Sequence, residues 1–177
     1  TLERVKQAFF NAIQFEVAGR TALDLFSGSG QLGLEALSRG AEFCFFNDAS
    51  VDACKIIEKN IISCDFLKKS QLTCKSYESC VKIINNSGKK ISLVFLDPPY
   101  GNGYVVDSLD LLDKYSVLEK DAIVVCESVV DDIAEHPSFD IRKQYNYSNI
   151  KVTILTYNRW KMEKIVIKKR PGNTAGD

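Results

Sequence analysis

The sequence is poor in the residues that build metal sites in small proteins. Its 177 residues contain one histidine, His136, and six cysteines, none of which forms a Cys-x-x-Cys pair. Structural zinc sites usually need such closely spaced ligands, so we expect no metal site. His136 is expected to be an exposed loop residue without a function. We expect reduced thiols that pack as small apolar residues at positions 44, 54, 64, 74, 80 and 126.

Long apolar runs and an excess of one charge are missing as well. The apolar runs are short, as at Ile123 to Cys126, and none approaches the ~20 residues that span a bilayer. No basic and apolar leader opens the chain, so we expect a cytoplasmic protein without a membrane partner. The 23 basic and 23 acidic residues cancel. This argues against a general nucleic-acid binder but allows a local basic patch.

Apolar periodicity predicts alternating strands and helices along most of the chain. We expect strands at 21–26, 43–46, 71–75, 91–96 and 122–127. Helices are expected at 2–15, from Leu32 towards Gly40, after the capping residues Ser50 and Ser76, and at 104–114. Two final strands, at 141–145 and 152–157, have no helical pattern between them and predict an antiparallel hairpin.

This order of elements predicts a doubly wound α/β sheet with an antiparallel edge. No repeat or linker divides the sequence, so we expect a single domain over residues 1–167. Residues 168–177 are polar and contain proline and glycine, and we expect them to form a flexible tail.

A glycine-rich loop follows the first predicted strand and opens a helix. Gly28, Gly30 and Gly33 match the pattern Gly-x-Gly-x-x-Gly, which brings a ligand close to the backbone and lets the helix pack tightly on the sheet. Asp48 ends the second strand, where a carboxylate can accept hydrogen bonds from both hydroxyls of a ribose. These features fit a dinucleotide as well as S-adenosylmethionine.

Asp24, four residues before Gly28, distinguishes the two cofactors. A dinucleotide brings a pyrophosphate to such a loop, and a carboxylate would repel it. S-adenosylmethionine brings an ammonium and a sulfonium, and opposite charges ~4 Å apart attract by several kcal/mol at an effective dielectric of about 20. We therefore expect S-adenosylmethionine, with a loop-bracing carboxylate as the alternative role of Asp24. No Gly-Lys-Ser/Thr follows, which excludes a Walker-type phosphate loop.

A short acidic turn, Asp97-Pro98-Pro99-Tyr100, follows the fourth predicted strand. Ligands of such sheets bind beyond the carboxyl ends of the strands, so we expect this turn to face the glycine loop across one crevice. A nucleobase is a candidate methyl acceptor for such a crevice. Its exocyclic amino nitrogen is a weak nucleophile because the lone pair is delocalised into the ring. The Asp97 carboxylate and the Pro98 carbonyl can accept its N–H groups and localise that pair.

The other residue types in the turn suit the same chemistry. The two prolines stiffen the backbone and remove N–H donors, and Tyr100 can stack on a base, which stabilises binding by ~1–3 kcal/mol. Attack on a sulfonium methyl group needs in-line placement of the reacting atoms. A rigid turn with a purely structural role is the alternative.

Taken together, these motifs resemble the bacterial small-subunit ribosomal RNA guanine-N2 methyltransferases of the D type, also described as the conserved-hypothetical-protein-95 type. The similarity runs from about Thr1 to Glu127, and Glu127 ends the fifth predicted strand. It rests on Arg4 to Asn11, on the most specific block, DLFSGSGQLGLEALSRG at 24–40, and on Asp97 to Tyr100.

The resemblance implies a Rossmann-like class I methyltransferase fold, with a seven-stranded, mostly parallel sheet and helices on both faces. The cofactor S-adenosylmethionine would be bound by residues Asp24, Phe26, Ser27, Gly28, Gly30, Asp48 and Ser76. The target amino group would be held by Asp97, Pro98, Pro99 and Tyr100. The substrate would be a guanine of 16S ribosomal RNA, free or in the small ribosomal subunit, and family members commonly act as monomers.

The sequence departs from the family pattern in three places. A basic β-hairpin usually precedes the first helix and is not recognisable here. Ser76 stands where an Asp or Asn commonly holds the adenine amino group, and Asp48 replaces a commoner Glu after Asn47. Phosphate contacts, or simply a solvated face, are expected at Arg4, Lys6, Lys161, Lys164, Lys168, Lys169 and Arg170.

Four other functions share part of this pattern. Adenine-N6 methylation of DNA or RNA uses the same acidic turn. A protein glutamine methyltransferase usually carries Asn at the position of Asp97, and a nicotinamide-dependent oxidoreductase would share only the glycine pattern. A non-catalytic RNA-binding domain would have no need of Asp97 and Tyr100. Guanine-N2 methylation of 16S ribosomal RNA is the favoured hypothesis.

Overall fold

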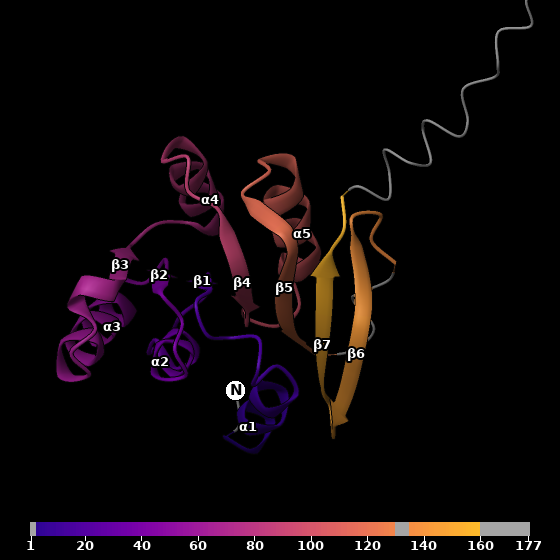
Figure 1. The fold of residues 1–177 in the computed structure, drawn as a ribbon, viewed down its shortest axis with the longest axis horizontal. Helices are drawn as coiled ribbons and strands as arrows, with labels where there is room; N and C mark the ends of the chain where they lie inside the picture. Colours follow the sequence, from indigo (N-terminus) through magenta and orange to yellow (C-terminus); the bar gives the residue numbers. More distant parts are fainter. Residues whose placement is uncertain (1–2, 130–134, 160–177) are drawn as a thin grey trace, which may run out of the picture.

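A computed structural model describes residues 3–129 and 135–159, which are arranged around one seven-stranded sheet (Figure 1). The strands are β1 (Thr21–Asp24), β2 (Phe43–Asn47), β3 (Ser70–Thr73), β4 (Ile91–Leu96), β5 (Leu118–Ser128), β6 (Phe139–Tyr147) and β7 (Ile150–Tyr157). Their order across the sheet is β3-β2-β1-β4-β5-β7-β6. The first five strands pair in parallel, and β7 is antiparallel to both of its neighbours. The predicted sheet with its antiparallel edge hairpin is confirmed.

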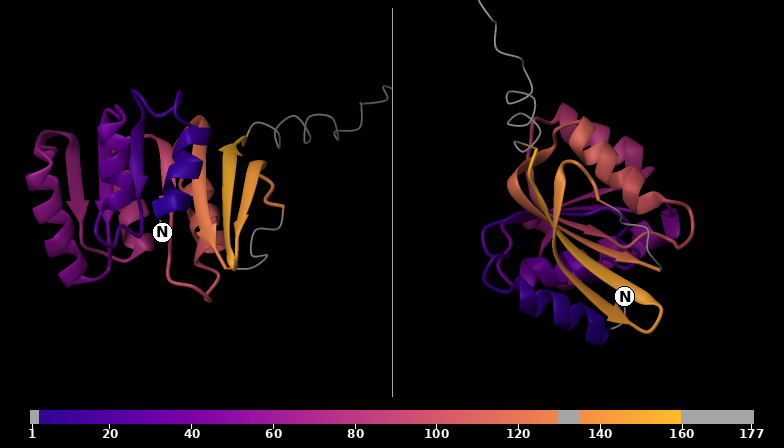
Figure 2. Two further views of the ribbon diagram at one scale, coloured as in Figure 1. Left: turned by 90° about the horizontal axis from the view of Figure 1, so that it is seen from below. Right: turned by 90° about the vertical axis from the view of Figure 1, so that its right-hand side faces the viewer.

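Helices cover both faces of this sheet, as the right-hand view in Figure 2 shows. They are α1 (Glu3–Ala12), α2 (Gln31–Ser38), α3 (Val51–Ser63), α4 (Tyr77–Asn86) and α5 (Tyr104–Lys114), with a short 3-10 turn at Leu67–Lys69. One apolar core lies between the sheet and α1, α2 and α3, and a second lies between the sheet and α4 and α5. All six residues of β4 are buried, as expected for a central strand that is covered on both faces.

Several element boundaries differ from the prediction. Helix α1 ends at Ala12 instead of residue 15, and Phe15 is 92% exposed, so another turn would have had no apolar surface to pack on. Strand β1 ends at Asp24 instead of residue 26, and the chain that follows stays bonded to the sheet, because the Leu25 N–H donates to the Phe95 carbonyl and the Ser27 N–H to the Asn47 carbonyl. Strand β5 begins at Leu118 and reaches the predicted segment through a shift in its register with β4.

The two predicted helix caps are present. The Ser50 hydroxyl accepts a hydrogen bond from the Ala53 N–H at the start of α3. The Ser76 hydroxyl accepts one from the Ser79 N–H at the start of α4. Each serine therefore occupies the N-cap position of its helix, where serine is strongly preferred.

Two expectations about rare residues need correction. Cys64 and Cys74 are exposed rather than packed, while Cys44, Cys54, Cys80 and Cys126 are buried free thiols as expected. The side chain of His136 is only 10% exposed, and its Nε2 lies 3.0 Å from Asp110 Oδ1. Its ring packs edge-on against Phe139, so His136 ties the segment before β6 to α5.

The described residues contain neither a membrane-spanning helix nor a cluster of metal ligands. Within 3–129 and 135–159, no helix combines the length and the apolar character that a membrane span needs. Within the same ranges, no three His, Cys, Asp or Glu side chains gather as a metal site requires. The predicted tail at 168–177 and the upper boundary of the domain at 167 lie outside the described residues.

The tight packing of α2 on β2 depends on Gly33. A Cβ atom at this position would lie 2.3 Å from the Phe46 ring and 2.7 Å from the Cys44 sulfur. We expect Gly33→Ala to lower the free energy of unfolding by roughly 1–3 kcal/mol, as overpacking of a core does. Urea unfolding measures the effect, with the exposed Ser38→Ala on the same helix as the control. Equal stability of the two variants would show that α2 can move away from β2 without loss of stability.

Candidate active site

The glycine loop joins β1 to α2 and is fastened to the end of β2. The Gly28 N–H donates to Asp48 Oδ2 at 2.9 Å, and the Ser50 N–H donates to Asp48 Oδ1 at 2.9 Å. Gly28 and Gly30 have φ values of 58° and 82°, a left-handed conformation that favours glycine. A Cβ at Gly28 would meet no atom within 4 Å, so the backbone there is open to a ligand.

Asn47 holds three strand ends together behind this loop. Its buried side-chain amide donates to the carbonyls of Leu25 and Lys75, at 3.2 and 3.0 Å, and its Oδ1 accepts from the Lys75 N–H. These bonds tie the ends of β1 and β3 to β2. From the sequence, Asn47 is recognisable only as a departure from the family pattern, because its partners are 22 and 28 residues away.

Asp24 lies beneath the loop and is only 1% exposed. Its Oδ2 accepts a hydrogen bond from the Gly33 N–H at 3.0 Å, and its backbone carbonyl accepts one from the Ser27 hydroxyl. Burial raises the pKa of Asp24 to about 7, with further increases from the charges of Asp97 and Asp48 and an opposing effect from the Gly33 N–H. The loop-bracing role is therefore visible, and the carboxyl can change charge near neutral pH.

A cavity of about 600 Å³ opens beside the loop, which is a suitable size for a small ligand. Its walls combine the glycine loop, the end of β2, the start of α4 and the acidic turn after β4. The lining residues are Leu25, Phe26, Gly28, Asn47, Asp48, Ala49, Ser76, Tyr77, Glu78, Asp97, Pro98, Pro99, Tyr100 and Tyr104. The glycine loop and the Asp97–Tyr100 turn thus share one cavity, as expected.

Three aromatic side chains form one side of this cavity. The rings of Phe26, Tyr77 and Tyr104 have centroids 5.5 to 6.1 Å apart. They come from the loop after β1 and from the first residues of α4 and α5. Only Phe26 among the three was predicted as a site residue. Tyr77 and Tyr104 fall in the helices predicted after Ser76 and at 104–114, and their meeting depends on how α4 and α5 pack on the sheet.

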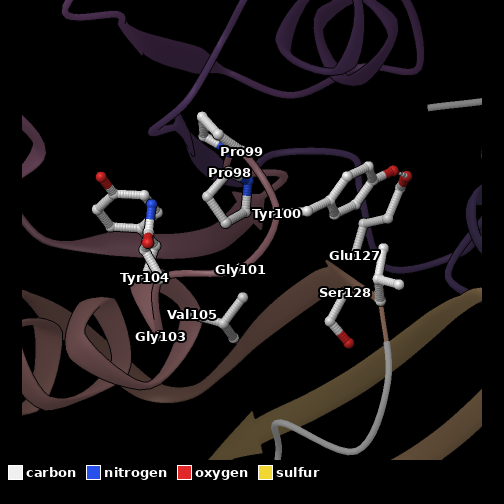
Figure 3. A pocket seen from close by; sticks show the side chains of 11 residues that line it. Pro98, Pro99, Tyr100, Gly101, Gly103, Tyr104, Val105, Glu127 and Ser128 are labelled. Carbon is white, nitrogen blue, oxygen red and sulfur yellow. Dashed lines mark hydrogen bonds between the residues drawn. The ribbon is translucent and has the colours of Figure 1, made fainter.

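The acidic turn lies next to a second carboxylate, Glu127 at the end of β5 (Figure 3). The Tyr100 hydroxyl donates to Glu127 Oε1 at 3.1 Å. Partial desolvation raises the pKa of Tyr100 to about 12, with added contributions from Glu127 and Asp97. Tyr100 is therefore a neutral hydrogen-bond donor at neutral pH, and 55% of its surface is exposed to an incoming substrate.

The predicted site residues fall into two groups. Cavity-lining positions are taken by Phe26, Gly28, Asp48, Ser76, Asp97, Pro98, Pro99 and Tyr100. Asp24 lies beneath the loop, and Ser27 and Gly30 shape the loop from within: the Ser27 hydroxyl donates to the Asp24 carbonyl, and the Gly30 N–H donates to the Ser27 carbonyl. Any effect of Asp24 on a ligand must therefore act through space rather than by direct contact in this conformation.

The predicted phosphate contacts at α1 have different outcomes. Arg4 is exposed, and its guanidinium lies 5.8 Å from the centre of the Tyr147 ring. Lys6 is only 7% exposed and forms ion pairs with Glu3 at 3.0 Å and with Glu35 at 3.9 Å. Its predicted role in RNA binding is wrong, because two carboxylates already neutralise this buried ammonium. The other predicted basic contacts, at 161, 164 and 168–170, lie outside the described residues.

Sequence comparison identifies a family and two informative relatives. The profile of a family described as "Conserved hypothetical protein 95" matches residues 1–156. A Bacillus subtilis protein named "Putative rRNA methyltransferase YlbH" is 36% identical over 127 residues, which cover 72% of this chain and 69% of that protein. The "Ribosomal RNA small subunit methyltransferase D" of Escherichia coli K12 is 29% identical over 132 residues, or 75% and 65% of the two chains. This chain therefore spans about two thirds of the length of these relatives.

Solved structures give the same fold. A conserved hypothetical protein of Streptococcus pyogenes is 31% identical, with a TM-score of 0.78 over 86% of this chain and 95% of that one. An RNA methyltransferase from Salinibacter ruber, solved in complex with S-adenosyl-L-homocysteine, has a TM-score of 0.68 over 90% and 94% of the chains. At 15% identity this second likeness concerns the fold alone.

The fold, together with the family match and the relatives named as methyltransferases, defines the class of protein: a class I methyltransferase, whose cofactor is S-adenosylmethionine. The shared Gly-x-Gly-x-x-Gly pattern therefore does not indicate a nicotinamide cofactor here. The chain belongs to the Conserved hypothetical protein 95 family.

The raised pKa of the buried Asp24 carboxyl predicts that the folded protein loses stability as pH rises. Its pKa in the folded protein, about 7, lies above the ordinary 3.8, so the folded state binds a proton that the unfolded state has lost between pH 4 and 7. The free energy of unfolding should therefore fall as pH rises through this window. Asp24→Asn keeps an acceptor for the Gly33 N–H, removes the charge, and should stabilise the protein by roughly 1–4 kcal/mol at pH 8.

Urea unfolding between pH 4 and 8 tests this prediction. The stability difference between variant and wild type should shrink towards pH 4, where both side chains are neutral. Asp52→Asn is the matched control, because its side chain is 92% exposed. A difference that does not change with pH would contradict the raised pKa.

Proposed function

We propose that the protein transfers a methyl group from S-adenosylmethionine to the exocyclic N2 amino group of a guanine in 16S ribosomal RNA. One observation carries the proposal: a single cavity is lined both by Gly28 and Asp48 and by the turn from Asp97 to Tyr100. The residues proposed to bind the cofactor and those proposed to bind the acceptor therefore line the same cavity. The relatives named as ribosomal RNA methyltransferases support RNA as the substrate.

The residues of the cavity suit the proposed cofactor. The two oxygens of Asp48 each accept one backbone N–H and retain lone pairs that can accept the two hydroxyls of a ribose. The aromatic group of Phe26, Tyr77 and Tyr104 offers flat apolar surface to an adenine ring. The open backbone at Gly28 leaves room for the methionine portion. When bound, the cofactor supplies an electrophilic methyl group on a sulfonium.

The acceptor side is built from acceptors and one aromatic ring. We propose that the Asp97 carboxylate and the Pro98 carbonyl accept the two N–H groups of the target amine, which localises its lone pair. The Asp97 carboxylate also stabilises the positive charge that develops on this nitrogen. The exposed Tyr100 ring supports the flat face of the base. The base must leave its stack to reach this position.

An aromatic and basic patch offers a docking surface for the RNA near the cavity. It consists of Arg4 over the Tyr147 ring and Lys143 over the Tyr145 ring, with the two tyrosine rings stacked at 6.4 Å. Strand β7 begins beside the end of β5, where Lys151 pairs with Ser128. This end of the hairpin and the acidic turn therefore share one edge of the sheet, so a bound strand can contact both.

The proposal has one close alternative and two consequences. Adenine-N6 methylation would use the same acceptors, and the names of the relatives favour ribosomal RNA of the small subunit over DNA. A ribosomal RNA substrate would place the enzyme in the cytoplasm, and we propose that it acts as a monomer.

Methyl transfer from tritiated S-adenosylmethionine tests the acceptor. Substrates are unmodified small-subunit ribosomal RNA transcripts, the same RNA assembled with ribosomal proteins, and DNA. We expect N2-methylguanosine on nucleoside analysis of the ribosomal RNA. Asp97→Ala should lower the rate by at least 100-fold, because the amine loses a charged acceptor, while changing cofactor affinity by less than a few-fold.

The exposed Asp121→Asn, near the other end of β5, is the control for this variant and should keep wild-type activity. Turnover retained by Asp97→Ala would contradict the role of Asp97. Formation of N6-methyladenosine would show that the enzyme methylates adenine rather than guanine.

The charge of Asp24 predicts a pH dependence of cofactor binding. A cation bound beside the loop favours the ionised carboxyl, so affinity for S-adenosylmethionine should rise as pH increases through about 7, the pKa of Asp24 without ligand. Asp24→Asn should weaken binding about tenfold or more at pH 8 and flatten this dependence. Calorimetry from pH 6 to 8 measures both effects, and an unchanged affinity would leave Asp24 only its bracing role.

A further inference from the structure

Glu127, at the end of β5, carries a buried carboxylate oxygen that lacks a partner. The residue is only 5% exposed, and its Oε1 accepts the hydrogen bond from Tyr100. Its Oε2 is shielded from solvent and receives no hydrogen bond within ranges 3–129 and 135–159. Leaving such a group unsatisfied is unfavourable, and it commonly marks a place where a ligand supplies the missing donor.

The register of the sheet places Glu127 beside Asp97. Leu96 of β4 pairs with Cys126 of β5, so the next residue of each chain, Asp97 and Glu127, follows at the same edge. Side chains alternate between the faces of a sheet. Leu96 and Cys126 both pack in the core under α4 and α5, so Glu127 points towards the opposite face. Asp97 lies one residue beyond β4 and lines the larger cavity, Glu127 lines a small pocket, and Pro98, Pro99 and Tyr100 line both. The two carboxylates therefore come from neighbouring strand ends and border the same turn.

A small pocket of about 20 Å³ lies between the acidic turn and Glu127. This volume holds a group of about the size of a water molecule. It can admit the N–H edge of a base whose ring lies outside, against Tyr100. Ser128 also has a hydroxyl without a partner among the described residues, but its side chain points away from that of Glu127 (Figure 3).

We propose that Glu127 determines the specificity for guanine by accepting the ring N1–H through Oε2, while Asp97 accepts an N–H of the adjacent N2 amino group. This inference rests on the proposed function. Guanine presents these two donors next to each other, and two neighbouring carboxylates match them. Adenine presents a lone pair at N1, which a carboxylate repels. Glu127 also holds the Tyr100 hydroxyl with its other oxygen, so it orients the ring that supports the base.

A comparison of guanine with 2,6-diaminopurine tests the contact between Glu127 and N1 separately from the binding of the N2 amino group. The base 2,6-diaminopurine carries the same N2 amino group as guanine, but its N1 accepts a hydrogen bond instead of donating one. Once mass spectrometry of nuclease fragments has located the methylated guanine, a synthetic segment with either base at that position can be ligated into the ribosomal RNA. We expect the wild-type enzyme to methylate guanine with a kcat/KM roughly 10–100-fold higher than 2,6-diaminopurine, because the mismatched N1 leaves a buried carboxylate unpaired.

Glu127→Gln changes the acceptor into an amide that can also donate to N1. We expect this variant to lose activity on guanine and to gain relative activity on 2,6-diaminopurine, so that the preference falls to about one or reverses. Tyr100→Phe removes only the hydroxyl that Glu127 holds. It should lower turnover on both bases and leave their ratio unchanged. The exposed Glu119→Gln, also on β5, should behave as wild type.

The outcomes separate this inference from the function on which it rests. No N2-methylguanosine from the wild-type enzyme would refute the proposed function itself. Methylated guanine with equal rates on the two bases would overturn the role of Glu127, and this test needs no variant. If Tyr100→Phe shifts the ratio as much as Glu127→Gln does, Glu127 acts only by positioning Tyr100, and the proposed contact with N1 is refuted.

Discussion

The parallel pairing of β1 with β4, and of β4 with β5, is the constraint on which the site depends. Asp24 of β1 pairs with Phe95 of β4, and Leu96 pairs with Cys126 of β5. Because parallel strands run in the same direction, the loops that follow them emerge at one edge of the sheet. The glycine loop, the acidic turn and Glu127 therefore meet although about 100 residues separate the first from the last.

A second consequence of this arrangement is an accumulation of negative charge. Asp24, Asp48 and Asp97 lie close enough that the latter two raise the pKa of the first. Such a cluster destabilises the folded protein without ligand and favours a ligand that carries positive charge. The cofactor has a sulfonium and an ammonium, so part of the folding stability is sacrificed for binding, as is common at functional sites.

Most of the fold was predictable because the relevant signals are local. Periodicity located every strand of the sheet, and the caps at Ser50 and Ser76 were recognisable from residue type and spacing. The errors lie where tertiary contacts override a local pattern. Strand β1 ends two residues early, where the glycine loop bonds through Ser27 to the end of β2, and Lys6, which reads as a surface cation, is buried between two glutamates.

The sequence alone determined the class of chemistry, because the glycine pattern, Asp24 and the Asp97–Tyr100 turn each carry their meaning in residue type and order. The tertiary structure decided which of these side chains face the cavity. It buried Asp24 beneath the loop, turned the Ser27 hydroxyl towards the Asp24 carbonyl, brought Tyr77 and Tyr104 against Phe26, and placed Glu127 next to the acidic turn. The reason is physical: side-chain direction follows from strand register and helix packing, which join residues too distant in sequence for any local pattern to relate.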